Sequence, residues 1–204
     1  MSERPDIHRL IDLHKLTLAF QSIERAVCYV EKNTDRPEND AEHSYTLAMT
    51  AWFLASSFPE LDRDKLIRYA LAHDLIEVYS GDTSVFADAA TLASKDKREE
   101  AGLNRLVKEW PDFLELTDAM RAYKQKSDDE AKFVYALDKI MPVILNYIYE
   151  GYSWQKHHIT FDQLHNTKKD KFHAAPKVGD YYQQLYKLLL KNPHFFHHSS
   201  SQQR

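Results

Sequence analysis

The sequence predicts an all-α protein folded as a single helical bundle, and glycine content, apolar spacing and continuity support this prediction. Only 4 glycines occur in 204 residues, whereas strand-and-turn architectures use glycine in many of their turns. Apolar residues instead recur every three or four positions among charged ones, as on one face of a helix. No repeat or flexible linker divides the chain, so we expect one domain over residues 1–192 and a flexible tail over 193–204.

Capping residues define the elements of the first half. A first helix is expected over residues 7–30, followed by a polar loop. Asn39 or Asp40 then caps a second helix. A third helix runs from about residue 63 to Gly81, where glycine fits the left-handed conformation that follows a helix end. The apolar stripe of the first helix comprises Leu10, Leu13, Leu16, Phe20 and Ile23.

In the second half, charged and apolar residues alternate at helical spacing over residues 94–109 and again to about 124. Ser127 and Glu130 have the spacing of a capping box, which opens a long helix to about residue 150. Two shorter helices complete the expected domain, and the last covers about 180–190.

Composition excludes several classes of protein. The net charge of -4 provides no broad basic face for nucleic acid. No apolar run approaches the roughly 20 residues of a membrane span, and the charged N-terminus lacks the apolar segment of a signal peptide. A single cysteine, Cys28, excludes an internal disulfide or a thiolate zinc cluster. We therefore expect a cytoplasmic protein that binds small molecules and contacts neither membrane nor nucleic acid.

The stretch "RYALAHDLIEVYSGDT" places His73 and Asp74 in an apolar context. An ionised carboxylate costs several kcal/mol or more in such surroundings unless its charge is compensated. Glu77 shares a helix face with this pair, and Asp82 follows just beyond Gly81. Taken alone, the group can also be a helix-terminal histidine with surface acids.

Two further residues favour a metal site. His43 lies in the first turn of an expected helix, and Asp138 lies in the apolar helix "FVYALDKIMPVIL". One divalent cation would compensate the carboxylates and bind the imidazoles. Nitrogen and oxygen ligands suit manganese, cobalt, iron, nickel or zinc.

A histidine, an adjacent His-Asp pair and a distant aspartate resemble the HD-domain superfamily of metal-dependent phosphohydrolases. The blocks "RPENDAEHS", "HDLIEVYSGDT" and "ALDKIMPVILNY" are similar to its 5'-deoxynucleotidase branch. The resemblance is strong over residues 36–154 and weak before 25 and beyond 158.

The resemblance implies a role for each site residue. His43, His73, Asp74 and Asp138 would be the metal ligands. Glu77 and Asp82 would be catalytic: Asp82 is favoured for activating or orienting the attacking water and Glu77 for positioning the substrate or transferring a proton, with the reverse order also open. The two arginines that would bind phosphate are Arg36 and, on a less certain alignment, Arg25.

The implied function is removal of the 5'-phosphate from nucleoside monophosphates, chiefly deoxyribonucleotides, by a metal-activated water. HD proteins that bind two metal ions have additional histidines in the interval between the His-Asp pair and the last aspartate. No histidine lies between Asp74 and His157 here, so the resemblance implies one metal ion rather than two. The alternatives are hydrolysis of another small phosphoester or of a nucleoside triphosphate, and a nucleotide sensor without turnover. A homodimer is expected from the resemblance and from the apolar surface of small helical domains.

Overall fold

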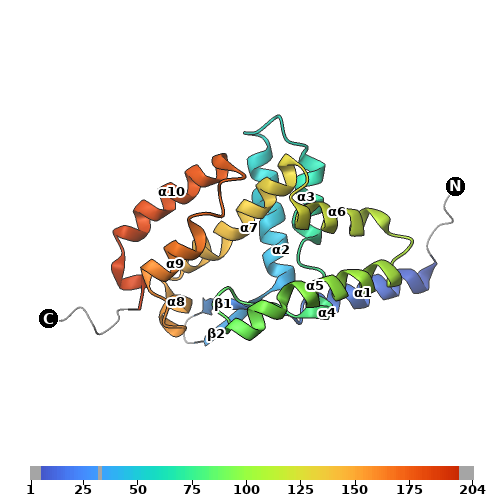
Figure 1. Ribbon diagram of the computed structural model, residues 1–204, viewed down its shortest axis with the longest axis horizontal. Coiled ribbons are helices and arrows are strands. Elements are labelled where there is room, and N and C mark those ends of the chain that lie inside the picture. Colours follow the sequence, from blue (N-terminus) through green and yellow to red (C-terminus); the bar gives the residue numbers. More distant parts are fainter. Residues whose placement is uncertain (1–5, 32–33, 198–204) are drawn as a thin grey trace.

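The computed structural model, described here for residues 6–31 and 34–197, confirms the helical fold and adds one small antiparallel sheet (Figure 1). The strands are β1 (Glu24–Glu31) and β2 (Thr34–Asn39). The helices are α1 (Ile7–Phe20), α2 (Asp40–Ala55), α3 (Arg63–Ala72), α4 (Glu77–Ser80), α5 (Ala89–Glu109), α6 (Leu114–Gln125), α7 (Asp129–Ile148), α8 (Tyr152–Lys156), α9 (Phe161–Lys168) and α10 (Pro176–Leu190), followed by the 3-10 turn η1 (Pro193–Phe195).

Helix α7 is the centre of the domain. It packs against α2, α3, α6 and α10 and also contacts β1 and α8. In Figure 1 it runs between the C-terminal helices α8–α10 and the earlier helices α3 and α6. Its apolar face is fully buried, as the 0% exposure of Val134 and 2% exposure of Leu137 illustrate. Burial of this face is the main local source of stability for a helix that also carries Asp138.

The prediction of one helix over residues 7–30 is wrong. Helix α1 ends at Phe20, and β1 pairs with β2 in an antiparallel register that sets Tyr29 opposite Arg36. The segment 26–30 is short and contains two valines and a tyrosine, which favour an extended chain. The predicted polar loop is therefore largely β2. This hairpin brings Arg25 and Glu38 against the first turn of α2.

Several helix ends differ from their predicted positions because other side chains cap them. Asn39 caps α2 and forms a capping box with Glu42, which confirms one of the two predicted caps. Asp128, not Ser127, caps α7. Glu130 instead accepts a hydrogen bond from the Asp62 backbone N–H at 2.9 Å, so it joins α7 to the start of α3.

Two other helices begin earlier than predicted. Asp88 accepts hydrogen bonds from the backbone and side chain of Thr91 and starts α5 at Ala89 rather than at 94. Helix α10 starts at Pro176 rather than at 180, with proline at a position that lacks a helical hydrogen-bond requirement.

Residues 193–197 pack against the domain, although they were predicted to belong to a flexible tail. Phe195 and Phe196 are buried, and the Phe196 ring stacks on Trp154 with centroids 4.6 Å apart. The His197 N–H donates to the Ile159 carbonyl at 3.0 Å. The rest of the predicted tail, 198–204, lies outside the described residues. In the described part of the chain, no helix is long and apolar enough to cross a membrane.

Replacing Phe196 with alanine should lower the free energy of unfolding by about 3–5 kcal/mol, because it removes a buried ring between Trp154 and Phe161. The exposed His194→Ala should change it by less than about 0.5 kcal/mol. Chemical denaturation of both variants provides the measurement. Wild-type stability of Phe196→Ala would contradict the packing of this segment.

Candidate metal centre

The His73–Asp74 pair lies on a tight turn between two helices, not within one helix as predicted. The last helical hydrogen bond of α3 joins the His73 N–H to the Tyr69 carbonyl at 3.0 Å. Shorter-range bonds then follow, such as Glu77 N–H to the Asp74 carbonyl at 2.8 Å. The chain tightens through this turn before α4 begins. As a result, Asp74 and Glu77 both line the same cavity.

Gly81 ends α4 and turns the chain toward Asp82. Its φ of 71° and ψ of 154° lie in a region that is essentially restricted to glycine, outside the left-handed helical conformation that was predicted. Arg98 of α5 holds the same loop. Its guanidinium donates to the Ser80 carbonyl at 2.5 Å and to the Thr83 hydroxyl at 2.8 Å. Asp82 thus lies on a loop whose two sides are held by hydrogen bonds from Arg98.

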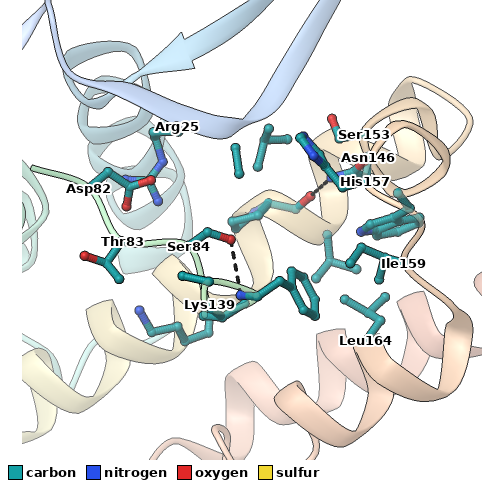
Figure 2. Close-up of a pocket in the computed structure, with 18 of the residues that line it drawn as sticks. Arg25, Asp82, Thr83, Ser84, Lys139, Asn146, Ser153, His157, Ile159 and Leu164 are labelled. Atoms are coloured by element: carbon teal, nitrogen blue, oxygen red, sulfur yellow. Dashed lines mark hydrogen bonds between the residues drawn. The ribbon is translucent and has the colours of Figure 1, made fainter. Parts of the chain in front are cut away.

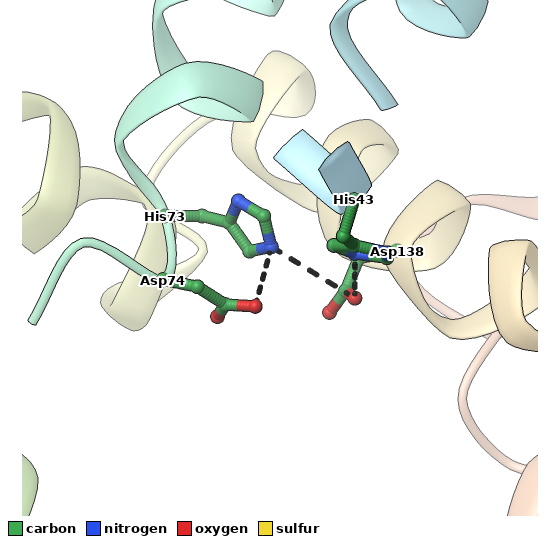
Figure 3. A group of neighbouring side chains, drawn as sticks. All are labelled: His43, His73, Asp74 and Asp138. Carbon is green, nitrogen blue, oxygen red and sulfur yellow. Dashed lines mark hydrogen bonds and ion pairs between the residues drawn. The ribbon is translucent and has the colours of Figure 1, made fainter. Parts of the chain in front are cut away.

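Four of the predicted residues converge at the centre of the domain (Figure 3). His43, His73, Asp74 and Asp138 each offer one donor atom, and these atoms lie within 4.8 Å of one another. His43 Nε2 is 3.1 Å from Asp138 Oδ1, and His73 Nε2 is 2.9 Å from Asp74 Oδ2. Two imidazoles and two carboxylates that lie this close could together hold one divalent cation.

The environment of His73 fits a cation. Its Nδ1 is 2.9 Å from the Ala70 carbonyl, which can only accept, so Nδ1 carries a proton in that contact. In the neutral ring, Nε2 then presents a lone pair. This nitrogen is buried without a hydrogen-bond partner and faces Asp74 and Asp138. A lone pair opposite carboxylate oxygens is favourable when a metal ion lies between them.

Asp138 is fixed by its neighbours. The Tyr123 hydroxyl donates to Oδ2 at 2.8 Å, and the Lys139 ammonium lies 2.5 Å from the same oxygen. Burial alone would raise the pKa of Asp138, but Lys139 and His43 outweigh it and hold that pKa well below its ordinary value. Oδ1 therefore remains an ionised donor that points toward the two histidines.

Arg25 joins the sheet to the centre. Its Nη1 lies 2.9 Å from both Asp40 Oδ1 and Asp74 Oδ2. Burial opposes the charge of this guanidinium, but Asp74 and Asp138 outweigh it and raise the pKa of Arg25. Glu38 Oε2 is 3.5 Å from Arg25 Nε and 3.5 Å from His43 Nδ1.

Negative charge accumulates beside Asp74. Glu77 is 5% exposed, and its carboxylate oxygen lies within 4.8 Å of donors on Asp40 and Asp74. Burial and the charge of these two aspartates raise the pKa of Glu77 to about 11. Burial and Asp74 likewise raise the pKa of Asp40 to about 6, and burial raises that of Asp82. The carboxylates therefore resist simultaneous ionisation without further positive charge.

The centre opens into a cavity of about 600 Å³. Figure 2 shows Arg25 and Asp82 at one end and Ile159 and Leu164 at the other. Asp74, Glu77 and Asp138 lie on the charged side. The apolar lining residues are Val85, Phe86, Pro142, Val143, Trp154, Ile159 and Leu164, and Asn146, Ser153 and His157 lie at the Ile159 end as well. The cavity therefore matches a small anion whose remaining part is uncharged and partly apolar.

The other candidates fall into two groups. Arg36 is not among the residues that line the cavity; its side chain is half-exposed and forms a two-pronged ion pair with Glu42 at 2.8 Å. Arg25 does line the cavity. Phe86, His157 and His158 also line the cavity, whereas Tyr79 does not and its hydroxyl donates to Glu109.

The sequence predicts no site role for five residues of this region: Glu38, Asp40, Tyr123, Lys139 and Lys168. Glu38 and Asp40 lie in a polar stretch that resembles an exposed loop. They are buried only because the hairpin folds over them, with exposed fractions of 4% and 0%. A signal did exist for Lys139, which directly follows an aspartate in an apolar helix. The sequence carried no comparable signal for Lys168.

The chain belongs to the HD domain family, whose model matches residues 20–179. It is 32% identical to the mouse (Mus musculus) 5'-deoxynucleotidase HDDC2 over 124 residues, which cover 60% of this chain and 61% of the mouse protein. It is 30% identical to the Danio rerio 5'-deoxynucleotidase HDDC2 over 153 residues, or 74% of each chain. The matched region thus spans about three-fifths of the length of the mouse relative.

Solved structures support the same fold. A protein described as a predicted metal-dependent phosphohydrolase from Magnetospirillum magnetotacticum MS-1 superposes with a TM-score of 0.76 and 25% identity, covering 93% of this chain and 96% of that one. A conserved hypothetical protein from Pyrococcus furiosus gives 0.57 at 22% identity, covering 88% and 99%, and shares the fold. The arrangement of helices is therefore shared with both solved structures.

Replacing Glu77 with glutamine should stabilise the metal-free protein increasingly as pH rises from about 5 to 9. The folded carboxyl has a raised pKa and keeps its proton, whereas the unfolded one has lost it. Wild-type stability therefore falls by about 1.4 kcal/mol per pH unit through this group, and the variant avoids that loss. Chemical denaturation with a chelator present measures the difference.

The matched control is Glu100→Gln, on the exposed surface of α5. Its stability should follow the wild type at every pH. Parallel profiles for Glu77→Gln and the wild type would show that Glu77 does not share the buried negative charge.

Proposed function

We propose that this protein is a metal-dependent phosphomonoesterase that removes the 5'-phosphate of nucleoside monophosphates, with deoxyribonucleotides preferred. The observation that carries the proposal is the cluster of two histidines and two aspartates, whose aspartates line a cavity that also has apolar wall residues. The names of the curated relatives, all 5'-deoxynucleotidases, support the substrate and the preference for deoxyribose.

The proposed ligands are His43, His73, Asp74 and Asp138, and their donor set suits a single manganese, cobalt, iron, nickel or zinc ion. A divalent cation held there supplies Lewis acidity toward a phosphoryl oxygen and toward a water molecule. Tyr123 and Lys139 would keep Asp138 ionised and oriented, and the Ala70 carbonyl would fix the tautomer of His73.

We assign the proton of the attacking water to Glu77. Its Oε2 is buried without a partner, and its carboxylate lies close to Asp74, a proposed metal ligand. Glu77 must be ionised to take that proton, which requires added positive charge in this acidic group. Asp82, on the braced loop at the cavity wall, would donate the proton that the leaving O5' needs. Both residues thus keep catalytic roles, in the order opposite to the one first favoured.

Arg25 is the better of the two proposed phosphate-binding arginines. Its Nη1 holds Asp40 and Asp74, while Nη2 has no hydrogen bond among the residues the structure describes. A guanidinium with a free edge at the cavity can bind equatorial phosphoryl oxygens as charge develops on them. Arg36 is committed to Glu42 and would need to leave that pair to contribute.

The experiment that tests this function is hydrolysis of a panel of ribo- and deoxyribonucleoside 5'-monophosphates, sugar phosphates and nucleoside triphosphates, with manganese, cobalt, nickel, zinc and magnesium each supplied to metal-free protein. Phosphate should be released from deoxyribonucleoside monophosphates ahead of the other compounds. Release chiefly from triphosphates or sugar phosphates would favour the alternative hydrolases. Tight nucleotide binding without turnover would favour a sensor.

Separate variants should distinguish residues that bind the metal from residues that are needed only for turnover. Asp74→Ala should lose bound metal and activity together, because it removes a ligand and leaves Arg25 without one of its carboxylates. Glu77→Gln should keep one metal per chain and lower kcat by about 100-fold or more, as expected for loss of a general base. Elemental analysis beside steady-state kinetics measures both properties. Full metal occupancy in Asp74→Ala would refute the ligand assignment.

A further inference from the structure

Lys168, the last residue of α9, is a buried cation to which no role has been assigned. It is 6% exposed and lines the cavity. No carboxylate or carbonyl in the described part of the chain bonds to its Nζ. This nitrogen also keeps some accessible surface, and because Lys168 lines the cavity, we take that surface to face the cavity. Isolated buried charges are costly, and they persist where a ligand or a partner meets them.

The other cations that line the cavity already have carboxylate partners. Arg25 binds Asp40 and Asp74, and Lys139 binds Asp138. Lys95 lies 3.4 Å from Glu99 within α5. Among the described lysines and arginines of the cavity wall, Lys168 is thus the one whose charge is still available to an incoming anion.

Lys168 lines the same cavity as Asp138 and Lys139. Burial and the nearby ammonium of Lys139 lower the pKa of Lys168 to about 7, and Asp138 partly opposes them. Its strongest charged neighbours are therefore a proposed metal ligand and the lysine that holds it. An anion bound between them would remove the repulsion and keep the ammonium charged.

We infer that Lys168 is a substrate-binding residue whose ammonium, presented by α9, holds the phosphate group of a monoester in the cavity that Arg25 also lines. This inference rests on the proposed function and deepens it. A monoester carries a dianionic terminal phosphate, which a second, unpaired cation favours over the singly charged phosphate of a diester. The residue thereby selects for terminal phosphate groups.

Calorimetric titration of the purified protein, at measured metal content, with inorganic phosphate and separately with 2'-deoxyadenosine tests the inference. Lys168→Met should weaken phosphate binding by about ten- to hundredfold, the usual value of a hydrogen bond to a charged group. Lys168→Arg should retain phosphate affinity within about threefold. The exposed neighbour Lys169→Met serves as the matched control and should bind phosphate like the wild type. Binding of the uncharged nucleoside should be the same in all four proteins.

Thermal unfolding separates binding from folding. Because Lys168→Met removes an unpaired buried charge, it should unfold at the wild-type temperature or above. Unchanged phosphate affinity in Lys168→Met would overturn the inference. So would lower unfolding temperatures in both Lys168 variants with loss of nucleoside binding, which indicates a structural role. These titrations need no turnover: phosphate binding that depends on Lys168 in a protein without nucleotidase activity would refute the proposed function alone.

Discussion

The structure depends on the excess of carboxylates buried around His43 and His73. Glu38, Asp40, Asp74, Glu77, Asp82 and Asp138 outnumber the nearby cations Arg25, Lys139 and Lys168. Such a group is stable only if some members stay protonated or if another positive charge joins them. The proposed divalent ion would provide that charge, and it would also give the buried, unpaired Nε2 of His73 a partner. The surrounding architecture, from the β1–β2 hairpin to the Pro142-containing α7, can be understood as the means of holding these acids together.

Each element contributes a specific constraint on this centre. The hairpin inserts Arg25 between Asp40 and Asp74, so that an acid of α2 and an acid of the turn after α3 approach a common cation. The tight turn after α3 directs Asp74 and Glu77 to one cavity, and α5 packs closely on it because Gly102 has no side chain: an added Cβ would lie 3.1 Å from the Ile76 carbonyl. The chemistry and the fold therefore share the same contacts, and changes in this turn should affect both.

The sequence indicated candidate site residues where an ionisable side chain has apolar surroundings along the chain. His73, Asp74 and Asp138 were identifiable because a charge within a buried helix requires a partner, and Asn39 because its capping chemistry is local. The segment 24–31 was misassigned because a short apolar run does not distinguish a strand from a helix. Glu38 and Asp40 look like loop residues until that hairpin folds over them. Arg36 matched a motif, but its pairing with Glu42 depends on where the strand places it. Lys168 required the tertiary structure, since nothing in its local sequence signals burial.

The central claim is that one divalent cation completes this acidic centre. Titration of metal-free protein with cobalt(II), followed by visible absorption and elemental analysis, tests it most directly, because the spectrum reports ligand type and the titration reports stoichiometry. The account predicts saturation at one ion per chain, with a spectrum of nitrogen and oxygen ligands that disappears in a His43→Ala, His73→Ala double variant. Failure to bind cobalt, or binding that survives loss of both histidines, would contradict it.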